Sequence, residues 1–126
     1  MEWLLFVKDR LHNILSNNPL SEHQIGNPLI ASDILKTEVF ARWLDGLRDL
    51  HARGRIQARI ERLAMGNPGD VKSVGEGVSE LRIDYGPGYR VYYTKRGREV
   101  IILLAGGDKR TQNRDIETAL RLKRNL

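Results

Sequence analysis

Basic side chains and one phenol gather between residues 72 and 110 in a pattern that suits contact with a phosphodiester. The candidates are Lys72, Arg82, Arg90, Tyr92, Lys109 and Arg110. Guanidinium groups match phosphate oxygens with paired hydrogen bonds, ammonium groups add positive charge, and a tyrosine ring can stack on a base. The set therefore predicts binding of a nucleic-acid backbone, with Lys72, Tyr92 and Arg110 as binding residues.

The remaining members of the set could cleave RNA. In that reaction the 2′-hydroxyl attacks the adjacent phosphate, so a site must help to deprotonate this hydroxyl, stabilise the added negative charge and protonate the leaving 5′-oxygen. Arg82 and Arg90 are the candidates for charge stabilisation, and Lys109 or Lys72 for proton transfer. A purely structural interpretation also fits, in which Asp84 and Arg90 form an ordinary cross-strand ion pair. From the residues alone both interpretations stay open.

The sequence offers few residues for metal binding, nucleophilic catalysis or nucleotide binding. The chain has no cysteine, and His12, His23 and His51 lie far apart, so neither a metal site nor a nucleophile activated by histidine is predicted. The stretch from Gly106 to Lys109 lacks the glycine spacing of P-loops and of dinucleotide-binding loops. We therefore expect no metal and no small-molecule cofactor.

Two alternating segments must position the candidate residues as a β-hairpin. Apolar and polar residues alternate from 80 to 85 and from 89 to 94, and Gly86-Pro87-Gly88 between them suits a three-residue loop. The expected cross-strand pairs are Tyr85–Tyr89, Asp84–Arg90, Ile83–Val91, Arg82–Tyr92 and Leu81–Tyr93. One face of this hairpin is apolar, and the other carries the arginines, a carboxylate and a phenol.

The segment after the hairpin predicts a buried third strand. Val100–Ala105 is continuously apolar, which is typical of a central strand. Gly106 and Gly107 follow, and we expect them to turn sharply or to let backbone approach a ligand. Lys109 and Arg110 would then lie at the mouth of this loop, beside the polar side of the hairpin.

Helical spacing precedes and follows the strands. Ile34 and Leu35 suit a short first strand, and Thr37 suits a helix N-cap. Apolar residues recur with helical spacing at 40–47 and 52–64, with a break near Gly46 and an end at Gly66. The outer face of the second helix carries Arg53, Arg55, Arg59 and Arg62, which fits either a solvated face or contact with an anionic partner. A last helix is expected from about Thr111 to the C-terminus.

Length and charge limit the number of domains and the kind of partner that the chain can have. The chain of 126 residues fits one compact domain, expected over residues 34–126, and its net charge of +5 favours an anionic partner. Residues 1–33 are expected to form a helical leader, with an amphipathic helix at 2–15 and a linker at 16–33. Their apolar run is too short to span a bilayer. The absence of cysteine favours a reducing compartment, with the cytoplasm as the default.

Three strings of sequence resemble a known family. They are FARWLDGLRD, RIQARIERLAMGNPGDVKSVGEGVSELRIDYGPGYRVYY and LLAGGDKRTQNRDI, within a region from Ile34 to about Leu122. In these strings the chain resembles the RelE/ParE toxin superfamily, and within it the HigB-like, phage Gp49-like "addiction module killer" branch. The resemblance implies an α+β, RelE-like fold with two N-terminal helices packed on a curved, mainly antiparallel sheet and a C-terminal helix.

The resemblance also implies a function and assigns residues by position. It implies the toxin of a type II toxin–antitoxin system, paired with a helix-turn-helix antitoxin, that cleaves mRNA on the ribosome and so inhibits translation. Arg90 matches the arginine used at the scissile phosphate, Lys109 the basic residue after the last strand, and Lys72 an RNA-contacting position. The tyrosine or histidine that such relatives often carry near the C-terminus is absent after Leu104. A ParE-like poison of DNA gyrase without chemistry of its own, or a non-toxic protein-binding relative, are the alternatives.

Overall fold

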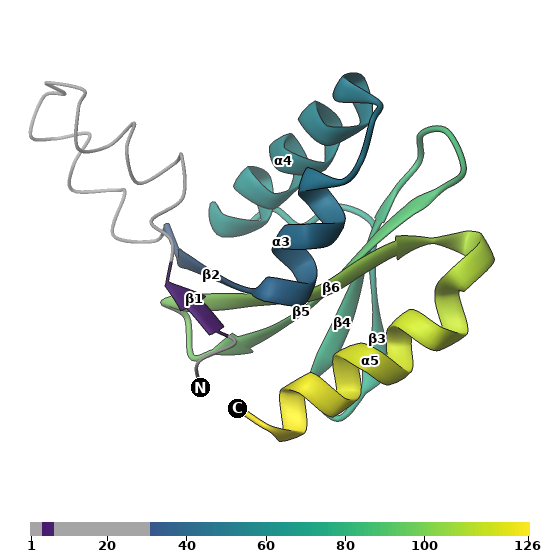
Figure 1. The fold of residues 1–126 in the computed structure, drawn as a ribbon. Coiled ribbons are helices and arrows are strands. Elements are labelled where there is room, and N and C mark those ends of the chain that lie inside the picture. The colour runs from purple at the N-terminus through teal and green to yellow at the C-terminus, as the bar shows by residue number, and fades with distance from the viewer. Residues whose placement is uncertain (1–3, 7–30) are drawn as a thin grey trace, which may run out of the picture.

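The computed structural model describes residues 4–6 and 31–126, which form one sheet with helices on both faces (Figure 1). The strands are β1 (Leu4–Phe6), β2 (Asp33–Thr37), β3 (Val71–Gly75), β4 (Val78–Ile83), β5 (Tyr89–Arg96) and β6 (Val100–Asp108), and the helices are α3 (Glu38–Asp45), α4 (Leu50–Ala64), the 3₁₀ turn η2 (Lys109–Thr111) and α5 (Gln112–Arg124). The strand order is β1-β2-β6-β5-β4-β3; β2 is parallel to β6 and the other neighbours are antiparallel. The predicted α+β class with a mainly antiparallel sheet is confirmed.

Side-chain caps begin the two N-terminal helices. The Thr37 hydroxyl accepts a hydrogen bond from the Phe40 amide at 3.1 Å and donates one to the Leu104 carbonyl at 2.6 Å. One residue therefore caps α3 and ties it to β6. Asp49 caps α4 in the same way, which satisfies amide groups that have no partner inside the helix. The predicted cap at Thr37 and the break at Gly46 are confirmed.

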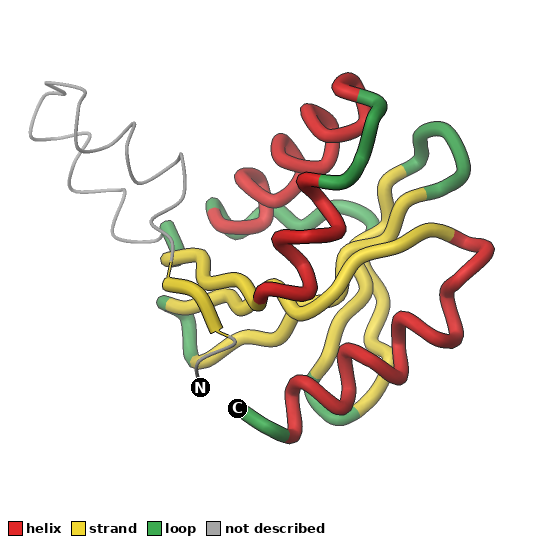
Figure 2. Tube along the Cα trace, in the orientation of Figure 1, coloured by secondary structure: helices red, strands yellow, loops and turns green. Residues whose placement is uncertain are grey.

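The helices cover the two faces of the sheet unequally (Figure 2). The larger core lies beneath α3 and α4 and includes Phe40, Leu44, Ile56, Ile60, Leu63, Leu81, Ile83, Val91, Ile101 and Leu103. A smaller core lies beneath α5 and includes Val78, Tyr92, Ile102, Leu104, Ala119 and Leu122. Since β5 and β6 contribute to both cores, they are buried on both sides, as the apolar run of β6 predicts.

The β4–β5 hairpin forms with a register that differs from the prediction by two residues. The observed pairs are Ile83–Tyr89, Arg82–Arg90, Leu81–Val91 and Glu80–Tyr92. Residues 84–88 form the loop, which folds back on itself through hydrogen bonds of 3.0 Å from the Tyr85 amide to the Ile83 carbonyl and from the Gly88 amide to the Tyr85 carbonyl. Because the shift is even, each strand side chain keeps its predicted face. The predicted Asp84–Arg90 pair is wrong, since Asp84 lies in the loop.

A strand that the prediction lacks precedes this hairpin. Residues Val71–Gly75 form β3, which pairs with β4 at one edge of the sheet, where the sequence predicts no strand. The segment is short and polar and contains glycine, so it shows no clear alternation. Lys72 therefore lies on a strand, directly opposite Glu80.

β6 runs to Asp108, past the predicted end at Ala105. Gly106 and Gly107 are strand residues, so the loop expected there is wrong. A Cβ at Gly106 would overlap the Trp43 ring, and a Cβ at Gly107 would overlap the Asp115 carboxylate. The two glycines let the backbone approach the protein's own helices, one on each face of the sheet.

The N-terminal segment contributes a strand. Leu4–Phe6 form β1 and pair with β2 at the other edge of the sheet, so the helix predicted for residues 2–15 is wrong at these positions. The rest of that helix, and the predicted linker as far as residue 30, lie outside the described residues. Asp33 begins β2.

Candidate functional site

Four strands bring the predicted polar residues together on the sheet face that α5 partly covers. Lys72, Glu80, Tyr92 and Ala105 form one row across the sheet, and Arg82, Arg90 and Gly107 form the next. Residues directly opposed on antiparallel strands project from the same face. We call Lys72, Glu80, Arg82, Arg90 and Tyr92 the polar face. Lys72, Arg82 and Arg90 therefore share one face of the sheet, and their roles in binding and catalysis stay predictions.

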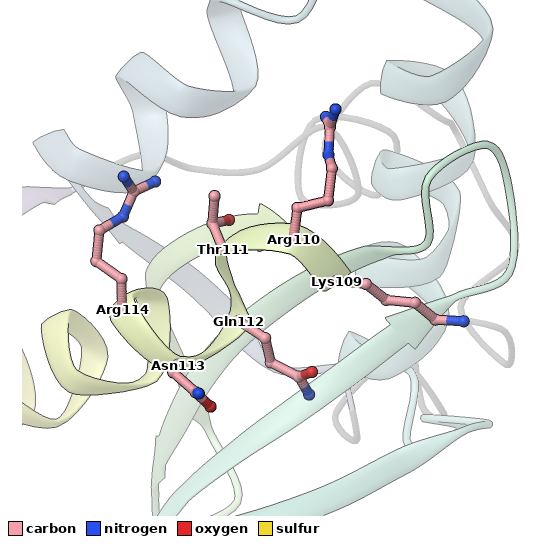
Figure 3. Close-up of a pocket in the computed structure, with 6 residues that line it drawn as sticks. All are labelled: Lys109, Arg110, Thr111, Gln112, Asn113 and Arg114. Atoms are coloured by element: carbon pink, nitrogen blue, oxygen red, sulfur yellow. The ribbon is translucent and has the colours of Figure 1, made fainter.

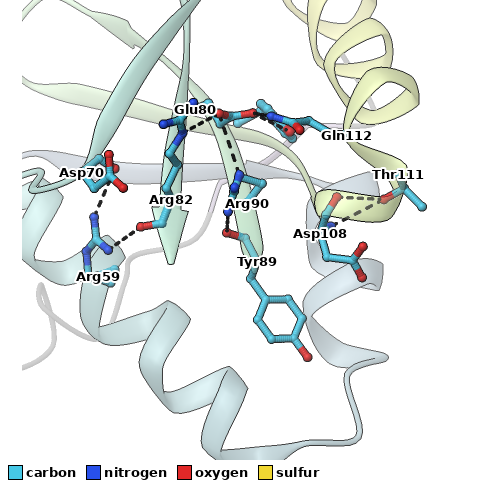
Figure 4. Close-up of polar contacts among 10 residues, drawn as sticks. Arg59, Asp70, Glu80, Arg82, Tyr89, Arg90, Asp108, Thr111 and Gln112 are labelled. Carbon is cyan, nitrogen blue, oxygen red and sulfur yellow. Dashed lines mark hydrogen bonds and ion pairs between the residues drawn. The ribbon is translucent and has the colours of Figure 1, made fainter. Parts of the chain in front are cut away.

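Glu80 is the centre of the polar face (Figure 4). Its oxygen Oε1 accepts a hydrogen bond from Arg82 Nε at 3.0 Å and lies 3.8 Å from Arg90 Nε. Its oxygen Oε2 accepts hydrogen bonds from the Tyr92 hydroxyl at 3.0 Å and from Gln112 Nε2 at 2.8 Å. Glu80 is fully buried. A buried charge needs such partners, and here they come from β4, β5 and α5.

The surroundings keep Glu80 ionised and Tyr92 protonated. Burial alone would raise the pKa of Glu80, but the hydrogen bonds that it accepts, first among them the one from Gln112, hold this pKa below its ordinary value. Burial and the hydrogen bond to Glu80 raise the pKa of the Tyr92 phenol far above its ordinary value. At neutral pH the phenol therefore donates and the carboxylate accepts.

The two arginines of the polar face differ in exposure. The side chain of Arg82 is 32% exposed and that of Arg90 is 9% exposed. Arg90 donates from Nη1 to the Tyr89 carbonyl at 3.0 Å, while its buried Nε makes no hydrogen bond within the described residues. A buried donor without a partner costs free energy. Arg82 can therefore meet an anion at the surface, and Arg90 adds charge from just beneath it.

Lys109 and Arg110 directly follow β6, next to the 84–88 loop, and the Arg110 side chain points the opposite way from Gln112, which contacts Glu80 (Figure 3). The Lys109 amide donates to the Gly88 carbonyl at 3.1 Å, and the Lys109 stem packs on Gly88, where a Cβ would lie 3.0 Å from Lys109 Cε. Arg110 Nη2 lies 2.9 Å from Asp108 Oδ2, and this contact lowers the pKa of Asp108. The exposed ammonium group of Lys109 is thus available to an anion, whereas Arg110 must exchange its contact with Asp108.

A shallow hollow of about 380 Å³ lies over the start of α5 and is lined by residues 109–114. The side chains that line it fan out in different directions (Figure 3). Enclosed small-molecule sites have converging polar groups in an apolar cavity, whereas an extended nucleic-acid backbone follows an open basic surface. The shape of the hollow fits the second kind of ligand.

Tyr92 lies where no RNA base can reach it. Its side chain is fully buried in the core beneath α5. The expectation that this ring is open for stacking is wrong, because α5 packs on this row of the sheet. The alternation of the strand indicated the face of Tyr92 correctly but not the helix that covers it.

Sequence reasoning missed three residues of the site, which are Glu80, Gln112 and Asp115. Asp115 is 7% exposed, accepts a hydrogen bond from the Thr111 hydroxyl at 2.5 Å and faces Gly107. The signal for Glu80 was present, since an acidic residue stood in the polar alternation two positions before Arg82. The signal for Gln112 and Asp115 is weaker, because it depends on where α5 begins.

Arg59 departs from the arginine stripe predicted on the second helix. It donates to the Arg82 carbonyl at 2.5 Å and to the Pro68 carbonyl at 2.8 Å. Burial lowers the pKa of its guanidinium, which remains charged at neutral pH. Arg59 therefore ties α4 to β4 and to the loop before β3. The interpretation of this residue as part of a solvated or partner-binding surface is wrong.

Two further findings concern residues 4–6 and 31–126. Within them, no three His, Cys, Asp or Glu side chains are grouped so that they could hold a metal ion. None of the helices in this part of the chain is long and apolar enough to cross a membrane.

Comparisons with known proteins match most of the chain. Residues 42–124 match the family model described as "Phage derived protein Gp49-like (DUF891)". An "Uncharacterized protein" of Haemophilus influenzae is 50% identical over 93 residues, which are 74% of this chain and 94% of that relative. No solved structure matches the chain. The polar face lies entirely within the matched residues, and the chain belongs to the phage-derived Gp49-like family, which is part of the addiction-module toxin group.

Proposed function

We propose that this protein is the toxin of a type II toxin–antitoxin system and a ribosome-dependent mRNA endonuclease with a RelE-like fold. Membership of a family in the addiction-module toxin group supports the toxin role. The observation that carries the nuclease role is the pairing of Arg82 and Arg90 across β4 and β5, beside the exposed Lys72 and Lys109. Paired guanidinium groups suit a phosphate that gains negative charge in the transition state.

The reaction assigns a role to each cation. The 2′-hydroxyl gives its proton to solvent water as its oxygen forms a bond to the adjacent phosphorus. The bond to the 5′-oxygen breaks and this oxygen takes up a proton, so the products are a cyclic phosphate and a 5′-hydroxyl end. Arg82 and Arg90 stabilise the charge on the phosphate oxygens, and Lys109 assists at the leaving oxygen. Lys72 and Arg110 hold flanking phosphates. Tyr92 does not touch RNA in this scheme.

A dependence on the ribosome follows from what the polar face offers. Among residues 4–6 and 31–126 the single histidine is His51. It lies on α4, on the other side of the sheet from the arginines. The described part of the site thus has no imidazole for proton transfer, which makes alignment of the 2′-hydroxyl more important. A ribosome that holds the mRNA in a fixed geometry supplies such alignment.

The partner expected for this toxin is a helix-turn-helix antitoxin with an acidic stretch. The net charge of +5 supports an acidic partner, because opposite charge speeds association and fixes orientation. The site of action is the cytoplasm, where translating ribosomes are.

Expression in bacteria tests the proposal. The native chain should arrest growth and produce new mRNA 5′ ends within coding regions, and Arg90→Ala should do neither. Arg96→Ala is a matched control, because Arg96 is an exposed arginine at the far end of the same strand. It should retain both effects.

The same cells distinguish the gyrase alternative. Growth arrest with intact mRNA and relaxed plasmid DNA would contradict the nuclease role and favour a ParE-like poison. Growth that continues without any arrest would contradict the toxin role itself.

A further inference from the structure

Glu80 divides its two carboxylate oxygens between two kinds of donor. Oε1 faces the guanidinium groups of Arg82 and Arg90, at 3.0 Å and 3.8 Å from their Nε atoms. Oε2 receives the neutral donors, the Tyr92 hydroxyl and the Gln112 amide. The neutral donors come from β5 and α5, so they fix the plane of the carboxylate from two directions. One oxygen is thereby held toward the arginines.

The arginines need this oxygen because they face each other. Arg82 and Arg90 are directly opposed in the β4–β5 register, where like charges repel. The Arg82 side chain is partly exposed, so without a counter-charge it could turn away from the buried Arg90. A fixed anion between them offsets the repulsion and leaves further nitrogens of the Arg82 guanidinium for a phosphate.

Burial excludes the more familiar role of a carboxylate at a ribonuclease site. A general base must reach the proton that it removes, directly or through one water. Glu80 is 0% exposed, and both of its oxygens already contact donors of the protein. Its hydrogen bonds also favour the ionised form, which makes it a weak base.

We propose that Glu80 is a positioning residue, whose carboxylate holds Arg82 and Arg90 side by side for the scissile phosphate without touching RNA. This inference rests on the proposed ribonuclease function for its activity readout. It has a second readout that does not depend on activity, namely the arginine Nε–H signals in the NMR spectrum of the folded protein.

The test compares Glu80→Gln with Glu117→Gln, which makes the same change at an exposed position on α5. Cleavage of a defined mRNA on ribosomes is followed in single turnover between pH 6 and pH 8.5. Glu80→Gln should slow cleavage about 10- to 100-fold, by analogy with the loss when a residue that orients a metal ligand is removed. The shape of the pH profile should not change. Glu117→Gln should stay close to the native rate.

In the NMR spectrum of Glu80→Gln, the Arg90 Nε–H signal should shift and exchange faster with solvent. In Glu117→Gln this signal should match that of the native protein. Native cleavage by folded Glu80→Gln would overturn the proposal. So would loss of the pH dependence in this variant, because that result identifies a general base.

A milder variant serves if Glu80→Gln does not fold. Gln112→Ala removes one donor from Oε2 at a partly exposed position. It should disturb the Arg90 signal and lower kcat more than it changes KM, whereas an unchanged Arg90 signal would contradict the positioning role. If the native protein cuts no RNA, the proposed function fails, but the arginine signals still decide whether Glu80 orders the pair.

Discussion

The sheet has two faces with different contents. Beneath α3 and α4 the strands present aliphatic and aromatic side chains, among them Leu81, Ile83 and Val91. Beneath α5 the alternate residues of the same strands include Glu80, Arg82 and Arg90, joined by hydrogen bonds and ion pairs. The alternation of a single hairpin thus separates the main core from the candidate site by the thickness of one sheet.

This arrangement assigns different tasks to neighbouring positions. Apolar burial on the α3–α4 face contributes most of the folding free energy, because the hydrophobic effect scales with the apolar area removed from water. The face beneath α5 contains charged groups that cost free energy to bury and that need several partners each. Variants on the first face should change stability alone, whereas variants on the second should also change activity.

The largest loss of stability is expected for Phe40→Ala on the α3–α4 face. Phe40 is 1% exposed, and deletion of a buried phenyl ring costs about 3–5 kcal/mol. Urea unfolding measures the loss, and the cleavage rate per folded molecule should not change. Val39→Ala, at the exposed neighbour on the same helix, should remain within about 0.5 kcal/mol of the native protein. A loss below about 1 kcal/mol for Phe40→Ala would contradict the assignment of the core.

The two adjacent glycines of β6 give a sharper comparison. Alanine at Gly106 meets the Trp43 ring, and alanine at Gly107 meets the Asp115 carboxylate. Each should cost about 1–3 kcal/mol, as overpacking does. Only Gly107→Ala should also slow cleavage, because it displaces the start of α5 beside the polar face. An equal loss of activity in both variants would show that the two faces are not independent.

Much of this fold was predictable from local signals. The Thr37 cap, the break at Gly46, the apolar run of β6 and the alternation in β4 and β5 all depend on residues close together in sequence. Together with Ile34 and Leu35 they predicted the helices α3, α4 and α5, the four strands β2, β4, β5 and β6, and the face on which each arginine lies. Of the resemblance, the phage Gp49-like branch is the part that the comparisons confirm.

The errors share one cause, which is that tertiary contacts decided the outcome. Two adjacent glycines, at positions 106 and 107, predict a loop. They lie in a strand because Trp43 and Asp115 pack closely against them. The hairpin register was set by hydrogen bonds inside the 84–88 loop. Burial of Tyr92 depends on where α5 lies. Local sequence likewise does not indicate which strand a short polar strand such as β3 will pair with.

A smaller loss of stability is expected for Tyr92→Phe. The change removes the phenol that donates to Glu80 at 3.0 Å but keeps the ring in the core. Loss of one hydrogen bond of this kind costs about 1.5–3 kcal/mol at most, because Gln112 still donates to the same oxygen. Urea unfolding of the native protein and the variant measures it. A variant as stable as the native protein would show that this bond contributes nothing.

The smallest change in stability is expected when the pH is lowered. The pKa of Glu80 is lower in the folded protein than its ordinary value of 4.5. Its contribution to stability is therefore complete above that value and is lost as the pH falls through the folded pKa. The urea midpoint should drop between pH 5 and pH 3, and it should drop less in Glu80→Gln. Parallel curves for the two proteins would show that Glu80 does not contribute.

The most direct test of the account is a purified translation reaction with a defined mRNA, with and without ribosomes. The 5′ ends of the mRNA are mapped after addition of the native protein, Arg90→Ala or Arg96→Ala. Cuts that require ribosomes, that vanish in Arg90→Ala and that persist in Arg96→Ala are the predicted result. Intact mRNA with the native protein, or equal cutting by folded Arg90→Ala, would contradict the claim that the polar face is a ribonuclease site.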